Sequence, residues 1–220
     1  MVTKDECFKQ LREVIDAVLS TVDDNGNPQS RIIDIMHIED DKIYFLTGCG
    51  KHVYSEIMNH PKISYLSLKD NKSIRISGEA HKLEDQKYWI DLIFENNPFM
   101  NNVYPGNARY ILEPFCIEDY EMEFFDLTQK PIFRQFFKFG DAEITVKGFE
   151  ITSGCIACGT CQASCPQQIP VLVEDKFEIP QEHCLHCGLC YENCPNDAIV
   201  KRELIDSIHL NKRELIDSFI

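Results

Sequence analysis

The run Cys155-Ile-Ala-Cys158-Gly-Thr-Cys161-Gln-Ala-Ser-Cys165-Pro166 recurs as Cys184-Leu-His-Cys187-Gly-Leu-Cys190-Tyr-Glu-Asn-Cys194-Pro195. Both copies have the pattern CxxCxxCxxxCP, and together they hold eight of the eleven cysteines. Each iron of a 4Fe-4S cluster takes one thiolate, and three cysteines spaced three apart on a tight loop can reach three irons of one cluster. The helix that follows carries the fourth cysteine away, so that it binds the other cluster.

The spacing therefore assigns each cluster three cysteines of one run and the last cysteine of the other run. The predicted ligand sets are Cys155, Cys158, Cys161 and Cys194 for the first cluster, and Cys184, Cys187, Cys190 and Cys165 for the second. A zinc site needs only four ligands, usually two CxxC pairs, and has no use for a third cysteine at the same spacing. Disulfides are disfavoured because nothing marks the chain as secreted.

From about residue 146 to residue 200 the chain resembles the bacterial two-cluster ferredoxins. Short strands are expected at 148–151, 176–179 and 198–200, around the two cysteine runs. One departure is that Gln-Gln-Ile169-Pro170 follows Cys165-Pro166, in place of small residues and glycine. His183 and His186 flank the second run, and with four cysteines per cluster they are expected to tune a cluster by hydrogen bonding, not to ligate it.

Composition limits the classes of partner. The 220 residues carry a formal net charge of −14, which argues against nucleic acid and anionic membranes and suits docking to basic patches on redox proteins. The N-terminus has no apolar signal region, and no run of eighteen apolar residues follows. We therefore expect a cytoplasmic protein, and the clusters favour an anaerobic source.

The first two thirds of the chain alternate short β-rich segments with amphipathic helices, which predicts an α+β or barrel architecture. Expected helices span 5–20, 51–59 and 85–95. Expected strands span 29–38, 42–47, 62–68, 73–83, 111–117 and 121–127, and 96–106 is expected to be loop.

Four segments carry a second resemblance, in this order: Ser30-Arg31-Ile-Ile-Asp34, residues 43–54, Asn59-His-Pro61 and Ile74-Arg75-Ile-Ser-Gly78. Over about residues 5–128 the chain resembles the flavin-binding split barrel of the pyridoxamine-phosphate-oxidase-like family. The resemblance implies FMN bound at the interface of a homodimer. The fold class expected for the whole chain is α+β, a mostly β split barrel followed by a small iron–sulfur domain.

Five residues are candidates for holding FMN. Arg31 offers a forked donor for phosphate or the ring edge, and Lys51 a point charge at the start of a helix whose free N–H groups favour phosphate. Thr47, Ser73 and Arg75 can donate to phosphate or ring. A surface or core role stays open for each of them. Cys49 lies in the Gly48-Cys49-Gly50 loop that precedes Lys51, whereas Cys7 and Cys116 are expected to be structural.

The predicted domains are a split barrel (1–128), an aromatic-rich connector (129–145), a two-cluster domain (146–200) and a C-terminal amphipathic helix (201–220). The last contains Lys-Arg-Glu-Leu-Ile-Asp-Ser twice, at 201–207 and 212–218. The aromatic connector is expected to pack against a barrel, because phenylalanines are rarely left in water.

The resemblances imply an oxidoreductase that passes electrons between two 4Fe-4S clusters and FMN, and that reduces a small molecule or a redox carrier. Two alternatives stay open: a flavoredoxin-like protein that only carries electrons, and a barrel that binds haem or deazaflavin. No GxGxxG sequence follows a strand, so no Rossmann nicotinamide domain is expected.

Overall fold

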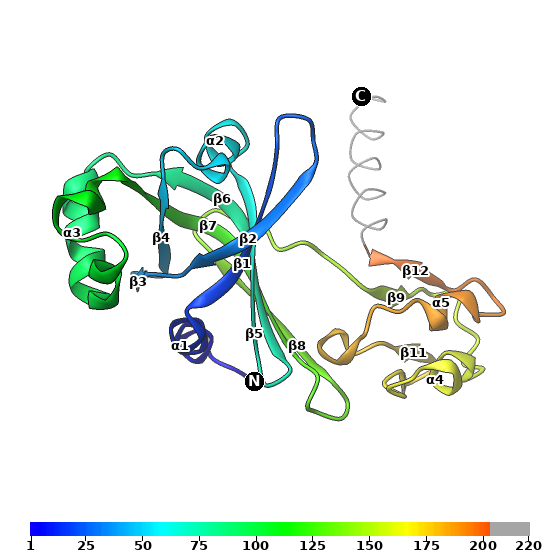
Figure 1. The fold of residues 1–220 in the computed structure, drawn as a ribbon. Coiled ribbons are helices and arrows are strands. Elements are labelled where there is room, and N and C mark those ends of the chain that lie inside the picture. The colour runs from blue at the N-terminus through cyan, green and yellow to red at the C-terminus, as the bar shows by residue number, and fades with distance from the viewer. Residues whose placement is uncertain (203–220) are drawn as a thin grey trace, which may run out of the picture. The chain divides into compact units, whose positions relative to one another are not determined.

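The computed structural model describes residues 1–202 (Figure 1). These form two compact units. The first contains Met1–Phe124 and Gln135–Ile144, and the second contains Phe125–Arg134 and the chain from Thr145 onward. The predicted C-terminal helix, apart from its first two residues, lies outside the described residues.

An eight-stranded, half-closed sheet dominates the first unit. Its strand order is β2-β1-β5-β6-β7-β4-β3, and β8 also pairs with β7. The strands are β1 (Asp16–Val22), β2 (Pro28–Asp34), β3 (His37–Glu39), β4 (Lys42–Gly48), β5 (Lys62–Lys69), β6 (Lys72–Lys82), β7 (Leu112–Asp126) and β8 (Phe133–Phe139). The mostly β architecture and the α+β class predicted from the sequence are confirmed.

Side chains alternate between the two faces of each strand, and those on the inner face form a core that contains several aromatic rings. Along β1, Ala17, Leu19 and Thr21 are buried, whereas the residues between them face outward. Phe45 lies at the centre, its ring centroid 5.4 Å from that of Phe115 and 5.6 Å from that of Tyr65. Burial of apolar side chains such as these is the main favourable contribution to the stability of this unit.

Helix α1 (Lys4–Val14) is shorter than predicted. The predicted helix over 5–20 is wrong in its second half, since Ile15 has φ +60° and β1 starts at Asp16. The β-branched residues that follow pair with β2 and β5, and this long-range pairing outweighs their local helical periodicity. Cys7 and Leu11 anchor the helix in the core, and burial raises the Cys7 pKa to about 12.

A capping box fixes the start of α1. The Thr3 hydroxyl accepts from the Glu6 N–H (3.2 Å), and the Thr3 N–H donates to Glu6 Oε2 (2.7 Å). We expect Thr3→Ala to lower the free energy of unfolding by about 1 kcal/mol. Urea denaturation followed by circular dichroism measures this. Thr3→Ser keeps the cap and should behave as wild type, so an equal loss in both variants would contradict the capping role.

Strand β7 replaces two predicted strands. The expected break at 118–120 does not occur, because Tyr120 is fully buried and its hydroxyl donates to Asp41 O at 2.7 Å. The strand therefore runs unbroken for 15 residues. Gly78 allows a close approach to it: a Cβ on Gly78 would lie 2.5 Å from Asp119 O and 2.7 Å from Tyr120 Cβ.

Three helices flank the sheet. Figure 1 shows α1 and α2 (His52–Asn59) at opposite ends of the barrel, with α3 (Gln86–Asn96) at its side. Helix α3 buries Ile90, Ile93 and Phe94 in a second core that includes Tyr44 and Leu46, on the other face of β4. The segment predicted as loop, 96–106, contains one short 3₁₀ turn, η1 (Pro98–Asn102), and a second, η2 (Gly106–Ile111), starts at its last residue.

Much of the predicted connector is strand β8. Phe139, at its end, is buried in the first unit, with its ring 4.5 Å from that of Tyr120. Ile132, just before β8, belongs to the second unit, where its N–H donates to Gln167 Oε1 at 3.0 Å and its carbonyl lies 2.8 Å from His183 Nδ1.

The second unit contains two small two-stranded antiparallel sheets and two short helices. Strand β9 (Phe149–Ile151) pairs with β12 (Ile199–Lys201), and β10 (Val171–Val173) pairs with β11 (Lys176–Glu178). The other elements are α4 (Thr160–Ser164), η3 (Gln181–His183) and α5 (Leu189–Glu192). Phe149, Phe177 and Ile199 pack with Cys161 and Cys190, so the cysteine loops are held by an apolar core.

Candidate cofactor sites

Two cavities in the second unit divide the eight cysteines of the repeated runs. The first is lined by Cys155, Cys158, Cys161 and Cys194, and the second by Cys165, Cys184, Cys187 and Cys190. Their volumes are nearly equal. Within residues 1–202 no three Cys, His, Asp or Glu side chains converge tightly enough to hold a single metal ion. Instead, four thiols line each of the two cavities, an arrangement that suits one 4Fe-4S cluster per cavity with one thiolate on each iron.

The two cysteine loops have the same local conformation. Ala157 and His186 have φ of 55° and 56°, and Gly159 and Gly188 have φ of 78° and 83°. The left-handed glycines precede α4 and α5, and they turn the third cysteine of each run back toward its cavity. The fourth cysteine lies beyond the helix.

Hydrogen bonds to the cysteine sulfurs differ between the cavities. In both copies a backbone N–H lies 3.4 Å from the first sulfur: Ala157 N to Cys155 Sγ, and His186 N to Cys184 Sγ. Among the described residues only the first cavity adds a side-chain hydroxyl to these contacts: the Cys158 thiol donates to Thr160 Oγ1 at 3.4 Å. This hydroxyl lowers the pKa of Cys158, whereas burial raises that of Cys190 to about 11.

A third cavity, of about 600 Å³, lies in the first unit where β2 meets the start of α2. Its lining includes Arg31, Lys51 and His52, together with Asp23 and Glu56. Lys51 is the N-cap residue of α2, and its side chain makes no capping hydrogen bond. The first N–H groups of an uncapped helix, with two nearby cations, provide the chemistry that a phosphate needs.

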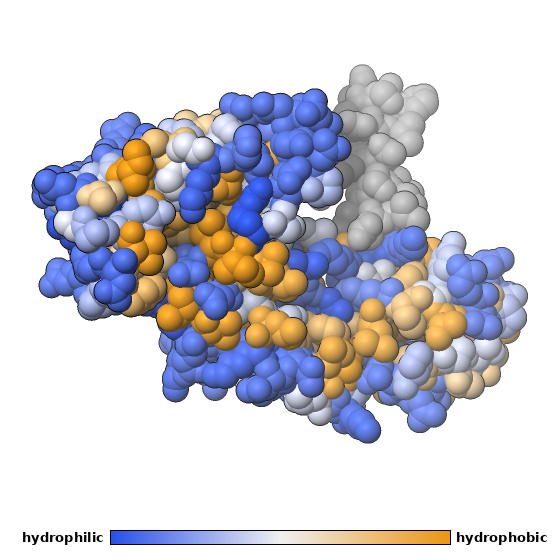
Figure 2. Space-filling view, in the orientation of Figure 1, coloured by the Kyte–Doolittle hydropathy of each residue, from blue (hydrophilic) through white to orange (hydrophobic). Residues whose placement is uncertain are grey.

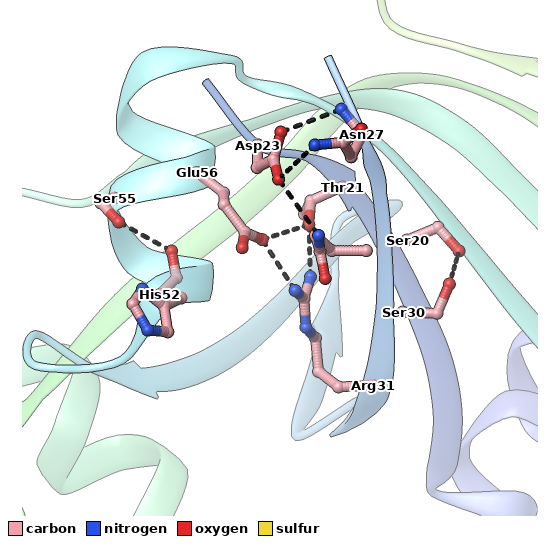
Figure 3. Close-up of polar contacts among 10 residues, drawn as sticks. Ser20, Thr21, Asp23, Asn27, Ser30, Arg31, His52, Ser55 and Glu56 are labelled. Atoms are coloured by element: carbon pink, nitrogen blue, oxygen red, sulfur yellow. Dashed lines mark hydrogen bonds and ion pairs between the residues drawn. The ribbon is translucent and has the colours of Figure 1, made fainter. Parts of the chain in front are cut away.

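A buried carboxylate holds Arg31 in this cavity (Figure 3). Arg31 Nη2 donates to Glu56 Oε2 at 2.8 Å, its Nη1 donates to Thr21 Oγ1, and Thr21 donates to the same Glu56 oxygen at 2.5 Å. Glu56 is 7% exposed and Thr21 3%. Glu56 therefore fixes the guanidinium at the cavity wall and also neutralises part of its charge.

Two family models match separate parts of the chain. Residues 3–103 match the model described as pyridoxamine 5'-phosphate oxidase, and residues 154–199 match that of the 4Fe-4S dicluster domain. The chain joins a pyridoxamine phosphate oxidase domain to a 4Fe-4S dicluster domain. Both resemblances predicted from the motifs are confirmed.

Individual relatives agree with the oxidase domain. A pyridoxine/pyridoxamine 5'-phosphate oxidase of Serratia proteamaculans is 33% identical over 92 residues, 39% of this chain and 42% of that protein. A similar enzyme of Citrobacter koseri is 29% identical over 79 residues, 35% of this chain and 36% of that protein. The chain thus spans less than half the length of these curated relatives.

The fold of the oxidase domain also occurs in a solved structure. A NimC/NimA family protein of Clostridium acetobutylicum superposes with a TM-score of 0.52 at 17% identity, covering 61% of this chain and 92% of that one. At this identity the likeness concerns the fold alone.

The oxidase domain brings together only two of the five predicted flavin residues. Arg31 and Lys51 line the same cavity, whereas Thr47, Ser73 and Arg75 are not part of its lining. Thr47 is buried, with no hydrogen-bond partner for its hydroxyl in the described chain. Ser73 and Arg75 lie on β6, and Arg75 forms an ion pair with Glu123. The roles of these three in flavin binding stay predictions.

Sequence reasoning did not find Thr21 and Glu56. They are 35 residues apart, and an acidic residue within the short helix 51–59 looks like an ordinary surface charge.

Of the cysteines outside the two runs, Cys116 is buried, with its pKa raised to about 11 by burial, and Cys49 is exposed. His183 contacts the backbone of Ile132 through its Nδ1. The part of the chain that the structure describes contains no helix able to span a membrane.

Proposed function

We propose that this chain is a flavin and iron–sulfur oxidoreductase that passes electrons between two 4Fe-4S clusters and FMN and reduces a small molecule or a redox carrier. The observation that carries the proposal is the division of eight cysteines between two cavities of nearly equal volume, in a chain with an oxidase domain. Clusters supply one-electron steps, whereas a flavin takes one or two electrons.

The side chains have separate tasks. The two sets of four cysteines would hold the clusters, each as thiolates. Arg31, Lys51 and the N-terminus of α2 would hold the FMN phosphate, and Glu56 would orient Arg31. No side chain in the third cavity is assigned to proton transfer, so the role of this chain is to bind and position redox groups. We place this activity in the cytoplasm of an anaerobic cell.

Metal and flavin analysis tests the proposal. Anaerobically purified protein should contain about eight irons, eight sulfides and one FMN per chain, with two clusters resolved spectroscopically. Zinc with four thiolates per ion, or disulfide-bonded cysteines, would refute the cluster assignment. Deazaflavin or haem in place of FMN would refute the flavin assignment alone.

Rapid mixing tests whether the two cofactor types form one relay. After reduction of the clusters, electron transfer to the flavin should proceed at a rate independent of protein concentration, because donor and acceptor belong to the same assembly. A rate proportional to protein concentration would mean that the domains exchange electrons only by collision, and the relay would be rejected.

A homodimer is part of the proposal. Val18 on β1 pairs with Ile32 of β2 and with Leu66 of β5, and Ile32 and Leu66 are 58% and 43% exposed. Figure 2 shows apolar surface over this part of the sheet. Ile32 also lines the third cavity, so a second copy on this face would cover the flavin site as well. Ile32→Lys should give monomers in sedimentation analysis, and an unchanged dimer would exclude this face.

A further inference from the structure

The two cysteine loops differ in their chemistry at the residue just before the third cysteine. Thr160 stands there in the first copy and Leu189 in the second, each directly after a left-handed glycine and each first in its short helix. The backbone is therefore alike in the two copies, and the first-cysteine sulfur of each accepts one N–H at the same 3.4 Å. The side chain at this position distinguishes them.

Thr160 Oγ1 lies 3.4 Å from Cys158 Sγ, within hydrogen-bonding range for sulfur. A cysteine that ligates iron is a thiolate and has no proton, so in the loaded protein the hydroxyl has to be the donor. Leu189 has no donor to offer Cys187, and its side chain is 42% exposed. The first cavity thus has a sulfur-directed donor that the second lacks.

We propose that Thr160 sets the two clusters apart: its hydroxyl raises the reduction potential of the cluster bound by Cys155, Cys158, Cys161 and Cys194, and Leu189 leaves the other cluster without this contribution. A hydrogen bond to a ligand sulfur draws electron density from the cluster, and the added negative charge of the reduced form is thereby stabilised. This inference rests on the proposed function, since it requires both clusters to be bound.

Other groups act on the same potentials. The N–H of Ala198 donates to Cys194 Sγ at 3.3 Å, which favours the reduced form of the first cluster too. Burial raises the pKa of Cys184, and the positive charge of Arg134 partly offsets this effect. The same positive charge near Cys184 favours the reduced form of the second cluster. Because these effects oppose one another, single variants test Thr160 better than the order of the two wild-type potentials does.

Potentiometric titration monitored by electron paramagnetic resonance tests the inference on the full chain. Thr160→Val replaces the hydroxyl by a methyl of similar size, and we expect only one of the two midpoint potentials to fall. Thr160→Ser keeps the hydroxyl and should leave both potentials near wild type. Leu189→Thr supplies a donor to Cys187, and we expect the other midpoint potential to rise.

The double variant Thr160→Val/Leu189→Thr shows whether the two positions act on different clusters. One potential should fall and the other rise, each as in the single variant. If both substitutions acted on one cluster, the shifts would cancel and the proposal would be wrong. Eight irons per chain with potentials unmoved by Thr160→Val would overturn this inference alone. Fewer than eight irons in the wild type would overturn the cluster assignment, and this inference with it.

Discussion

The double variant Cys161→Ala/Cys194→Ala should lose one cluster and keep the other intact, with about four irons per chain. Both residues line the first cavity, although they belong to different runs. With two of its four thiolates gone, that cluster cannot be retained, whereas the second cavity keeps all four cysteines. Iron and sulfide analysis, together with the resonance of the remaining reduced cluster, measures the result.

A second double variant makes the test decisive for the pairing. Cys190→Ala/Cys194→Ala removes two cysteines of the same run, which line different cavities. Both clusters should then be altered, because each loses one ligand. If instead this variant kept one intact cluster and the first variant lost both, each run would hold its own cluster. Cys49→Ala, which removes an exposed cysteine outside both cavities, should retain about eight irons.

Arg31→Ala and Lys51→Ala should each weaken FMN binding by about 1–3 kcal/mol, since each would remove one of the charge-assisted hydrogen bonds proposed for the phosphate. Glu56→Gln should do the opposite. It keeps an acceptor for Arg31 and Thr21 but removes the negative charge that Arg31 now faces in the cavity. Titration of the deflavinated protein with FMN, followed by quenching of flavin fluorescence, gives the three affinities.

A matched control separates a local effect from a general loss of charge. Lys87→Ala removes a lysine on α3 that pairs with Asp91 and lies outside the cavity lining, so FMN affinity should stay near wild type. Oligomeric state has to be measured in parallel. If Arg31→Ala and Lys51→Ala bind FMN fully while the dimer is intact, the phosphate site lies elsewhere.

Local patterns determined the parts of this protein whose chemistry is local. The cysteine runs fix their own loops, since three cysteines and a left-handed glycine lie within seven residues, and the hairpin of β5 and β6 follows from alternation around a four-residue turn. The helix ending before Pro61 is also a short-range feature. Such features depend on neighbours in sequence, and they were predicted close to their observed bounds.

Tertiary structure decided the features that depend on distant partners. Residues 16–20 have a helical pattern but form β1, because pairing with β2 and β5 satisfies their backbone and buries Leu19. Tyr120 keeps β7 unbroken through its contact with Asp41. Glu56 is the partner of Arg31 because α2 packs over β1 and buries its carboxylate. A buried carboxylate is costly unless a cation pairs with it. The sequence alone identified the cysteines proposed to bind clusters, whereas packing determined which charged groups share the third cavity, because charges couple through space and not along the chain.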